Sequence, residues 1–142
     1  MRAVIDTNVL VSALLWNGPP HALMANVREG LLEIAISPVL LAELSTVIGR
    51  SKFNAILVRA ESTREQILTE IRKLAEVIEP PPLPQPVCRD PDDDAVLALA
   101  IAAQVDWIIS GDDDLLSLRS YAGIAIISPV EALAKLVALD AN

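Results

Sequence analysis

The feature that most constrains the fold is a regular alternation of short apolar runs with longer helical patterns. The four runs that read as strands are rich in β-branched residues and cover residues 1–5, 31–36, 106–110 and 124–127. Pairs typical of a helix start lie between or after them, at Ser37-Pro38, Asp90-Pro91 and Ser128-Pro129. Strands that alternate with helices form a parallel sheet covered on both faces. The sequence therefore predicts an α/β fold.

The remaining segments complete this pattern. Further helices are predicted over residues 9–15, 21–29, 51–60, 63–77 and 91–103, with a short one after Gly111. Gly30 fits the C′ position of the helix over 21–29, and Ser62 with Glu65 fits a capping box for the helix over 63–77. Residues 79–86 hold five of the ten prolines and predict an extended crossing loop within one domain.

Size and composition suit a single domain over residues 1–142 with an aliphatic core. Hydrophobic residues make up 53% of the chain, but aromatic residues only 3%. The longest apolar run, residues 95–103, is far below the roughly 18 residues of a membrane span. Asp6 interrupts the stretch that a signal peptide would need, and Cys88 has no second cysteine to pair with. We therefore expect a cytoplasmic protein without a membrane partner.

Charge limits the chemistry that the chain can perform. Eleven basic and nineteen acidic residues give a net charge of −8, so the chain does not coat nucleic acid by bulk electrostatics. A single histidine, His21, excludes a site built from several histidines. Any catalytic chemistry must therefore be carried by carboxylates.

Four acids from distant segments are predicted to meet at one rim of the sheet. Asp6 ends the first strand, and Asp112 follows the third strand. Glu43 lies in the helix after the second strand, and Asp94 lies in the first turn of the helix after the proline-rich loop. Ligands of parallel α/β sheets bind outside the carboxyl ends of the strands. This rim is therefore the candidate site.

The acids also have ordinary explanations. Asp90, Asp92 and Asp113 fit helix caps or first turns, and Glu43 fits a solvated helix face. Asp6 is harder to explain in this way, because an acid at the end of a buried strand costs desolvation energy unless it is paired. Carboxylates that converge without bases repel one another, and a hard divalent cation relieves that repulsion. Oxygen ligands favour Mg²⁺ or Mn²⁺.

The ordered set of motifs resembles the PIN-domain nucleases over nearly the whole chain. The motifs are Val4-Ile5-Asp6-Thr7-Asn8, Glu43 in Leu41-Ala42-Glu43-Leu44, Cys88-Arg89-Asp90-Pro91-Asp92-Asp93-Asp94, and Ser110-Gly111-Asp112-Asp113-Asp114. They are similar to those of VapC-like toxins of toxin–antitoxin systems. The resemblance implies a three-layer α/β/α sandwich with a central parallel sheet of four to five strands. It also implies a metal-dependent ribonuclease that leaves 5′-phosphate and 3′-hydroxyl ends.

The resemblance assigns the four catalytic and metal-binding acids to Asp6, Glu43, Asp94 and Asp112. Within the two acidic triplets the last two assignments are ambiguous by one or two positions. Asp94 is preferred because it directly precedes the apolar run, and Asp112 because it follows the strand and a small-residue turn. The supporting positions are Thr7, Asn8, Ser110, Asp93 and Asp114.

Four basic residues lie within fifteen positions of the chain shortly after Glu43. They are Arg50, Lys52, Arg59 and Arg64. They are candidate RNA contacts, and the alternative is an ordinary solvated helix face. The resemblance further implies a homodimer and a cognate antitoxin, and the high aliphatic content leaves apolar surface for such association.

Other classes of protein remain as alternatives. A haloacid-dehalogenase-like phosphoryl-transfer enzyme also begins with an acid at a strand end, but it usually has a second Asp where this chain has Asn8. A receiver domain would have a Lys at the end of a later strand. A non-catalytic PIN-like binding module would retain the acidic rim as a structural feature only.

Overall fold

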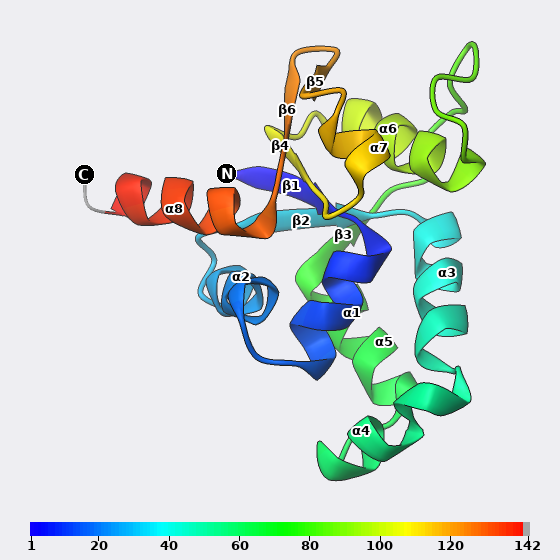
Figure 1. Cartoon of the computed structure of the whole chain (residues 1–142), viewed down its shortest axis with the longest axis vertical. Coiled ribbons are helices and arrows are strands. Elements are labelled where there is room, and N and C mark those ends of the chain that lie inside the picture. The colour runs from blue at the N-terminus through cyan, green and yellow to red at the C-terminus, as the bar shows by residue number, and fades with distance from the viewer. Residues whose placement is uncertain (141–142) are drawn as a thin grey trace.

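The computed structural model, which describes residues 1–140, contains a six-stranded sheet with helices packed around it (Figure 1). The strands lie in the spatial order β3 (Ala75–Val77), β2 (Glu33–Ile36), β1 (Arg2–Ile5), β4 (Trp107–Ile109), β6 (Ile124–Ile127) and β5 (Ser120–Tyr121). The first five are parallel, and β5 pairs antiparallel with β6. The predicted α/β class is confirmed, but the sheet has six strands rather than four to five.

Both additional strands are short edge strands. β3 covers residues that the sequence assigns to the end of a helix, because α5 (Arg64–Leu74) stops three residues before Val77. The chain then continues in extended form, and β3 pairs with β2 through the register Ile36↔Val77. β5 has two residues and forms a hairpin with β6 through Gly123, whose φ is +82°.

Helices cover both faces of the sheet. The other helices are α1 (Thr7–Leu15), α2 (Pro19–Arg28), α3 (Pro38–Ile48), the 3₁₀ turn η1 (Ser51–Phe53), α4 (Asn54–Arg59), α6 (Pro91–Ala103), α7 (Asp113–Leu116) and α8 (Pro129–Asp140). Figure 1 shows α6 and α7 on one side of the sheet and α1, α2 and α5 on the other. The three-layer arrangement is therefore as predicted. Within residues 1–140, no helix has the length and apolarity that crossing a membrane requires.

The helix starts follow the local signals in the sequence, with one correction. Ser37 Oγ accepts a hydrogen bond from Leu40 N at 3.2 Å, and Asp90 Oδ1 accepts one from Asp92 N at 2.9 Å. The capping box of α5 belongs to Thr63 and Gln66, not to Ser62 and Glu65. The helix begins one residue later than predicted, and this moves every cap position by one.

The core is aliphatic and fills both faces of the sheet, under α6 on one side and under α1, α2 and α5 on the other. β1, β2 and β4 pack against α6, whose fully buried residues include Leu97, Leu99 and Ala100. The order of the strands reverses at β1, because the chain passes first to β2 and β3 and then returns to β4 and β6. Parallel β1 and β4 end together, with Ile5 opposite Ile109. The switch point of the sheet therefore lies next to Asp6 and Ser110.

Candidate metal centre

Hydrogen bonds join the carboxyl ends of β1 and β4. Asp6 N donates to Ile109 O at 2.9 Å, and the fully buried Ser110 hydroxyl donates to Asp6 Oδ2 at 2.8 Å. Ser110 Oγ also accepts a hydrogen bond from Asp112 N at 3.0 Å. A single hydroxyl therefore fixes the Asp6 carboxylate and the backbone of Asp112 relative to each other.

Asp93 is a buried acid at the start of α6, with only 6% of its surface exposed. It lies on the helix face that packs against the sheet, together with Val96, Leu97 and Ala100 at helical spacing. Its Oδ2 atom is buried and has no hydrogen-bond partner among the described residues. A buried carboxylate oxygen without a partner is costly, and it needs a ligand that the protein itself does not supply.

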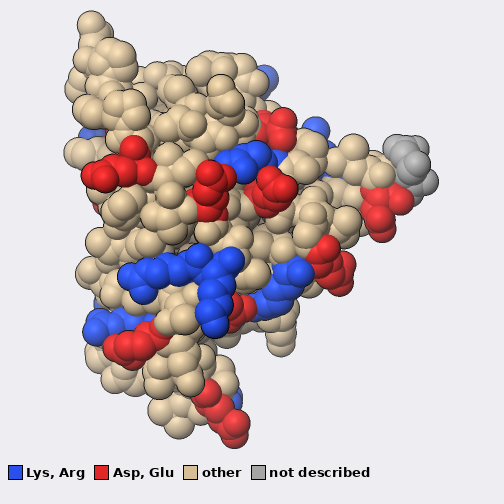
Figure 2. All heavy atoms as spheres, turned by 180° about the vertical axis from the view of Figure 1, so that it is seen from behind, with Lys and Arg blue, Asp and Glu red and all other residues tan. Residues whose placement is uncertain are grey.

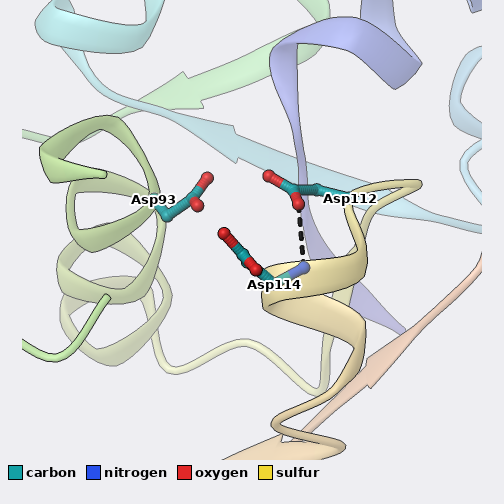
Figure 3. A group of neighbouring side chains, drawn as sticks. All are labelled: Asp93, Asp112 and Asp114. Atoms are coloured by element: carbon teal, nitrogen blue, oxygen red, sulfur yellow. Dashed lines mark hydrogen bonds between the residues drawn. The ribbon is translucent and has the colours of Figure 1, made fainter. Parts of the chain in front are cut away.

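Asp93, Asp112 and Asp114 form an acid cluster between α6 and α7 (Figure 3). One carboxylate oxygen from each lies within 4.8 Å of the other two. The three side chains point toward one another, and Asp112 Oδ1 accepts a hydrogen bond from Asp114 N at 2.9 Å. This all-oxygen donor set suits a hard divalent cation such as Mg²⁺ or Mn²⁺. Such a cation would also supply the partner that the buried Asp93 Oδ2 atom lacks.

The surroundings raise the pKa of Asp93 to about 7. Desolvation is the largest cause, followed by the negative charges of Asp112, Asp6 and Asp90. Burial also raises the pKa of Asp6, and the hydrogen bonds from Ser110 and Thr7 oppose that rise. The site therefore holds more negative charge than its own hydrogen bonds stabilise.

Glu43 lies on the same acidic rim, on α3 and outside the three-residue cluster. Burial raises its pKa, and the charges of Asp92, Asp6 and Asp90 raise it further. A hydrogen bond with the Thr7 side chain acts in the opposite direction. Thr7 is buried, whereas Asn8 is exposed on α1. Of the two predicted supporting residues after Asp6, Thr7 is the one that reaches an acid.

The structure does not bring Asp94 into the cluster. Its carboxylate accepts hydrogen bonds from Cys88 N at 2.8 Å and from Val87 N at 3.2 Å. Successive residues of a helix point about 100° apart, so Asp93 and Asp94 face different surroundings. The cluster therefore contains Asp93, which the sequence predicts as a supporting residue, and not Asp94, which holds the end of the proline-rich loop against α6.

Arg89 is a site neighbour that the sequence analysis missed. Its Nη2 atom donates to Asp114 Oδ1 at 2.8 Å and to Asp114 Oδ2 at 2.9 Å. The two residues are 25 positions apart, and no spacing rule links them. The only available signal was the position of Arg89 within the acidic motif that precedes α6.

The predicted basic residues lie beyond α3, and all four are exposed. Arg50 precedes η1, Arg59 ends α4 and Arg64 begins α5. Lys52 Nζ lies 5.1 Å from the ring centroid of Phe53. Figure 2 shows acidic and basic side chains interspersed on the face opposite to that of Figure 1. On that face the charges do not form one continuous basic surface.

Comparisons with known proteins bear on the family and the fold of the chain. Residues 2–114 match the family model of the PIN domain. An uncharacterized protein of Methanocaldococcus jannaschii is 34% identical over 120 residues, which cover 84% of this chain and 76% of that protein. The fold is similar to a chain in the crystal structure of VapBC2 from Rickettsia felis bound to a DNA fragment from their promoter, with a TM-score of 0.59 and 16% identity. That match covers 90% of this chain and 98% of the other.

Replacing Asp93 and Asp94 in turn distinguishes the two acids. Without metal, Asp93→Asn raises the melting temperature, because it removes a desolvated charge and its amide can donate to neighbouring carboxylates. Asp94→Asn lowers the unfolding free energy by about 1–3 kcal/mol, because it weakens two charge-assisted hydrogen bonds. Mn²⁺ stabilises the wild type and Asp94→Asn, but stabilises Asp93→Asn much less. Melting curves with and without Mn²⁺ measure all three effects, and equal Mn²⁺ responses in the two variants would contradict this assignment.

The pH dependence of stability follows from the raised pKa of Asp93. Between about pH 4 and pH 7 the folded chain retains a proton that the unfolded chain has released, so the metal-free melting temperature falls as pH rises. Mn²⁺ affinity changes in the opposite direction and rises about tenfold per pH unit below 7, because the metal displaces that proton. Thermal melts and calorimetric Mn²⁺ titrations from pH 5 to 8 test both trends. In Asp93→Asn the melting temperature should fall less as pH rises. An unchanged dependence of melting temperature on pH would assign the effect to another titrating group.

Proposed function

The chain belongs to the PIN-domain family, and we propose that it is a metal-dependent endoribonuclease whose single domain spans residues 1–142. PIN domains are generally nucleases. The observation that carries the proposal is the unpaired, buried Asp93 Oδ2 atom in a cluster with Asp112 and Asp114. A purely structural rim of acids would gain stability by pairing this oxygen within the protein, whereas a cation site leaves it free for the ion.

The ion would be held by Asp93, Asp112 and Asp114, with Asp6 next to them. A bound Mg²⁺ or Mn²⁺ lowers the pKa of water and stabilises negative charge on a phosphate. The protein contributes the arrangement of the oxygens. Ser110 orients Asp6, and the helix start at α7 fixes Asp112. These contacts preorganise the carboxylates, so little reorganisation is needed when substrate binds.

Glu43 is the proposed proton acceptor for the attacking water. Its raised pKa brings a carboxylate closer to the range in which it can accept a proton near neutral pH. Attack on phosphorus with departure of the 3′-oxygen leaves a 5′-phosphate and a 3′-hydroxyl. This chemistry needs no histidine, and the only histidine, His21, hydrogen-bonds Ala13 O on the α1–α2 side of the molecule.

The proposed biological role is that of a toxin in a toxin–antitoxin pair, acting on RNA in the cytoplasm. The fold similarity to a VapBC2 chain supports this role. A groove between the proline-rich loop and the starts of α3 and α6 is lined mostly by apolar side chains, together with the acids Glu79 and Asp94. An antitoxin segment with apolar residues and a basic side chain would fit this groove and the acidic rim beside it. The RNA contacts proposed for Arg50, Lys52, Arg59 and Arg64 would extend the binding surface away from the rim.

We also propose that the chain forms a homodimer through α8. The apolar face of α5 is buried, whereas α8 exposes Val130 and Val137, which lie seven residues apart on the same helix face. α8 extends from the body of the molecule and packs against α2 (Figure 1). A stable interface through this helix would bury about 1,000 Å² or more in total.

The nuclease proposal is tested with purified protein and a labelled single-stranded RNA. Wild type should cleave it with Mn²⁺ or Mg²⁺ and should be inactive in EDTA. Asp6→Asn and Asp93→Asn should each reduce the rate at least about 100-fold, because each removes a charge from the metal centre. Asp113→Asn is the matched control, because Asp113 is exposed and lies outside the cluster. Folded wild type that cleaves no RNA with either metal would contradict the proposal.

The dimer is tested by light scattering at micromolar concentration. The wild type should have twice the chain mass of 15.2 kDa. Val137→Glu should shift it to the monomer mass, because a charge on the exposed α8 face would be buried without a partner. Val58→Glu makes the same change on α4, where Val58 is 77% exposed, and should leave the dimer intact. A monomeric wild type would refute the dimer. It would leave the nuclease proposal unaffected, because all acids of the proposed metal centre belong to one chain.

A further inference from the structure

Arg89 brings a positive charge to the acid cluster from the end of the proline-rich loop. We infer that Arg89 is a substrate-positioning residue that pairs with Asp114 until a divalent cation takes over this carboxylate, and then holds a phosphate of the RNA strand. This inference rests on the proposed ribonuclease function. It goes beyond that function by naming a group that exchanges a protein carboxylate for the substrate.

The contact geometry supports an exchangeable pair. One guanidinium nitrogen, Nη2, lies 2.8 and 2.9 Å from the two oxygens of Asp114. One oxygen of Asp114 also lies within 4.8 Å of one oxygen each of Asp93 and Asp112. Within residues 1–140, Arg89 makes no other hydrogen bond or ion pair. Any cation that uses Asp114 as a ligand therefore competes with Arg89 alone.

The backbone around Arg89 is held on both sides, while its side chain remains in solvent. Asp94 accepts hydrogen bonds from the two preceding amides, Val87 N and Cys88 N. Asp90, the next residue, caps α6. The Arg89 side chain is 86% exposed. It can therefore turn away from Asp114 without disturbing the loop, and its Cα stays beside the acid cluster.

The exchange follows from the charges at the cluster. An exposed ion pair between one arginine and one carboxylate is weak. A divalent cation at three carboxylates interacts more strongly with Asp114, and it repels the guanidinium. The freed guanidinium has a planar fork of donors that matches two phosphate oxygens. A phosphate bound to the metal centre lies within reach of the Arg89 side chain, because the same side chain reaches Asp114.

The test compares Arg89→Ala and Arg89→Lys with Arg72→Ala, an exposed residue of α5 outside the cluster that gives the same change in net charge. Calorimetric titration with Mn²⁺ alone should give about two- to fivefold tighter binding for Arg89→Ala, because the competing cation is gone. In cleavage assays, Arg89→Ala should raise KM for a short single-stranded RNA about tenfold and change kcat less than threefold. Arg89→Lys should lie between, because an ammonium group cannot bridge two oxygens.

The salt dependence gives a further readout. The slope of log(1/KM) against log salt should decrease by about 0.7 in Arg89→Ala, as expected for one lost phosphate contact with a single strand. The inference is overturned if Mn²⁺ affinity is unchanged, if KM is unchanged, or if only kcat falls. Wild type that cleaves no RNA would refute the proposed function instead. The Mn²⁺ titration would then still decide whether the metal displaces Arg89.

Discussion

Mutual repulsion among carboxylates at the switch point is the constraint on which the rest of this structure depends. Burial raises the pKa of Asp93, and the nearby charges of Asp112 and Asp6 raise it further. The fold offsets part of this cost with helix starts, because Asp6 and Asp112 are the N-cap residues of α1 and α7, and Asp93 lies in the first turn of α6. The positive ends of three helix dipoles therefore meet at the acids. The remaining charge favours a cation.

The location of the site could be predicted from the sequence, because it depends on topology. Asp6 and Ser110 directly follow β1 and β4, and parallel strands end at the same edge. The identity of the third acid depends on helix phase, which the sequence does not reveal here. Residues 95–103 are apolar without interruption, so no amphipathic pattern indicates which side of α6 faces the sheet. The burial of Val96 and Ala100 on the sheet side of α6 brings Asp93 rather than Asp94 into the acid cluster.

The strands that the sequence did not predict share a physical cause. β3 and β5 have three and two residues, too few for an alternating pattern to be read. Each exists because a longer neighbour offers its edge, β2 for β3 and β6 for β5. The ion pair between Arg89 and Asp114 is also not predictable from local sequence, because it depends on where the proline-rich loop ends in space. Such features come from tertiary packing and are not encoded in local sequence.

The acidic charge of the chain is compatible with an RNA substrate once the basic residues are followed individually. Arg2 pairs with Glu33 and Glu76, and Arg28 pairs with Glu70, so these arginines are engaged in holding elements together. The net charge of −8 makes attraction of RNA through the bulk charge of the chain weak. Binding must then be concentrated where a divalent cation reverses the sign of the local potential. An enzyme built in this way would bind RNA strongly only after its metal centre is filled, and metal supply would control substrate binding as well as the chemical step.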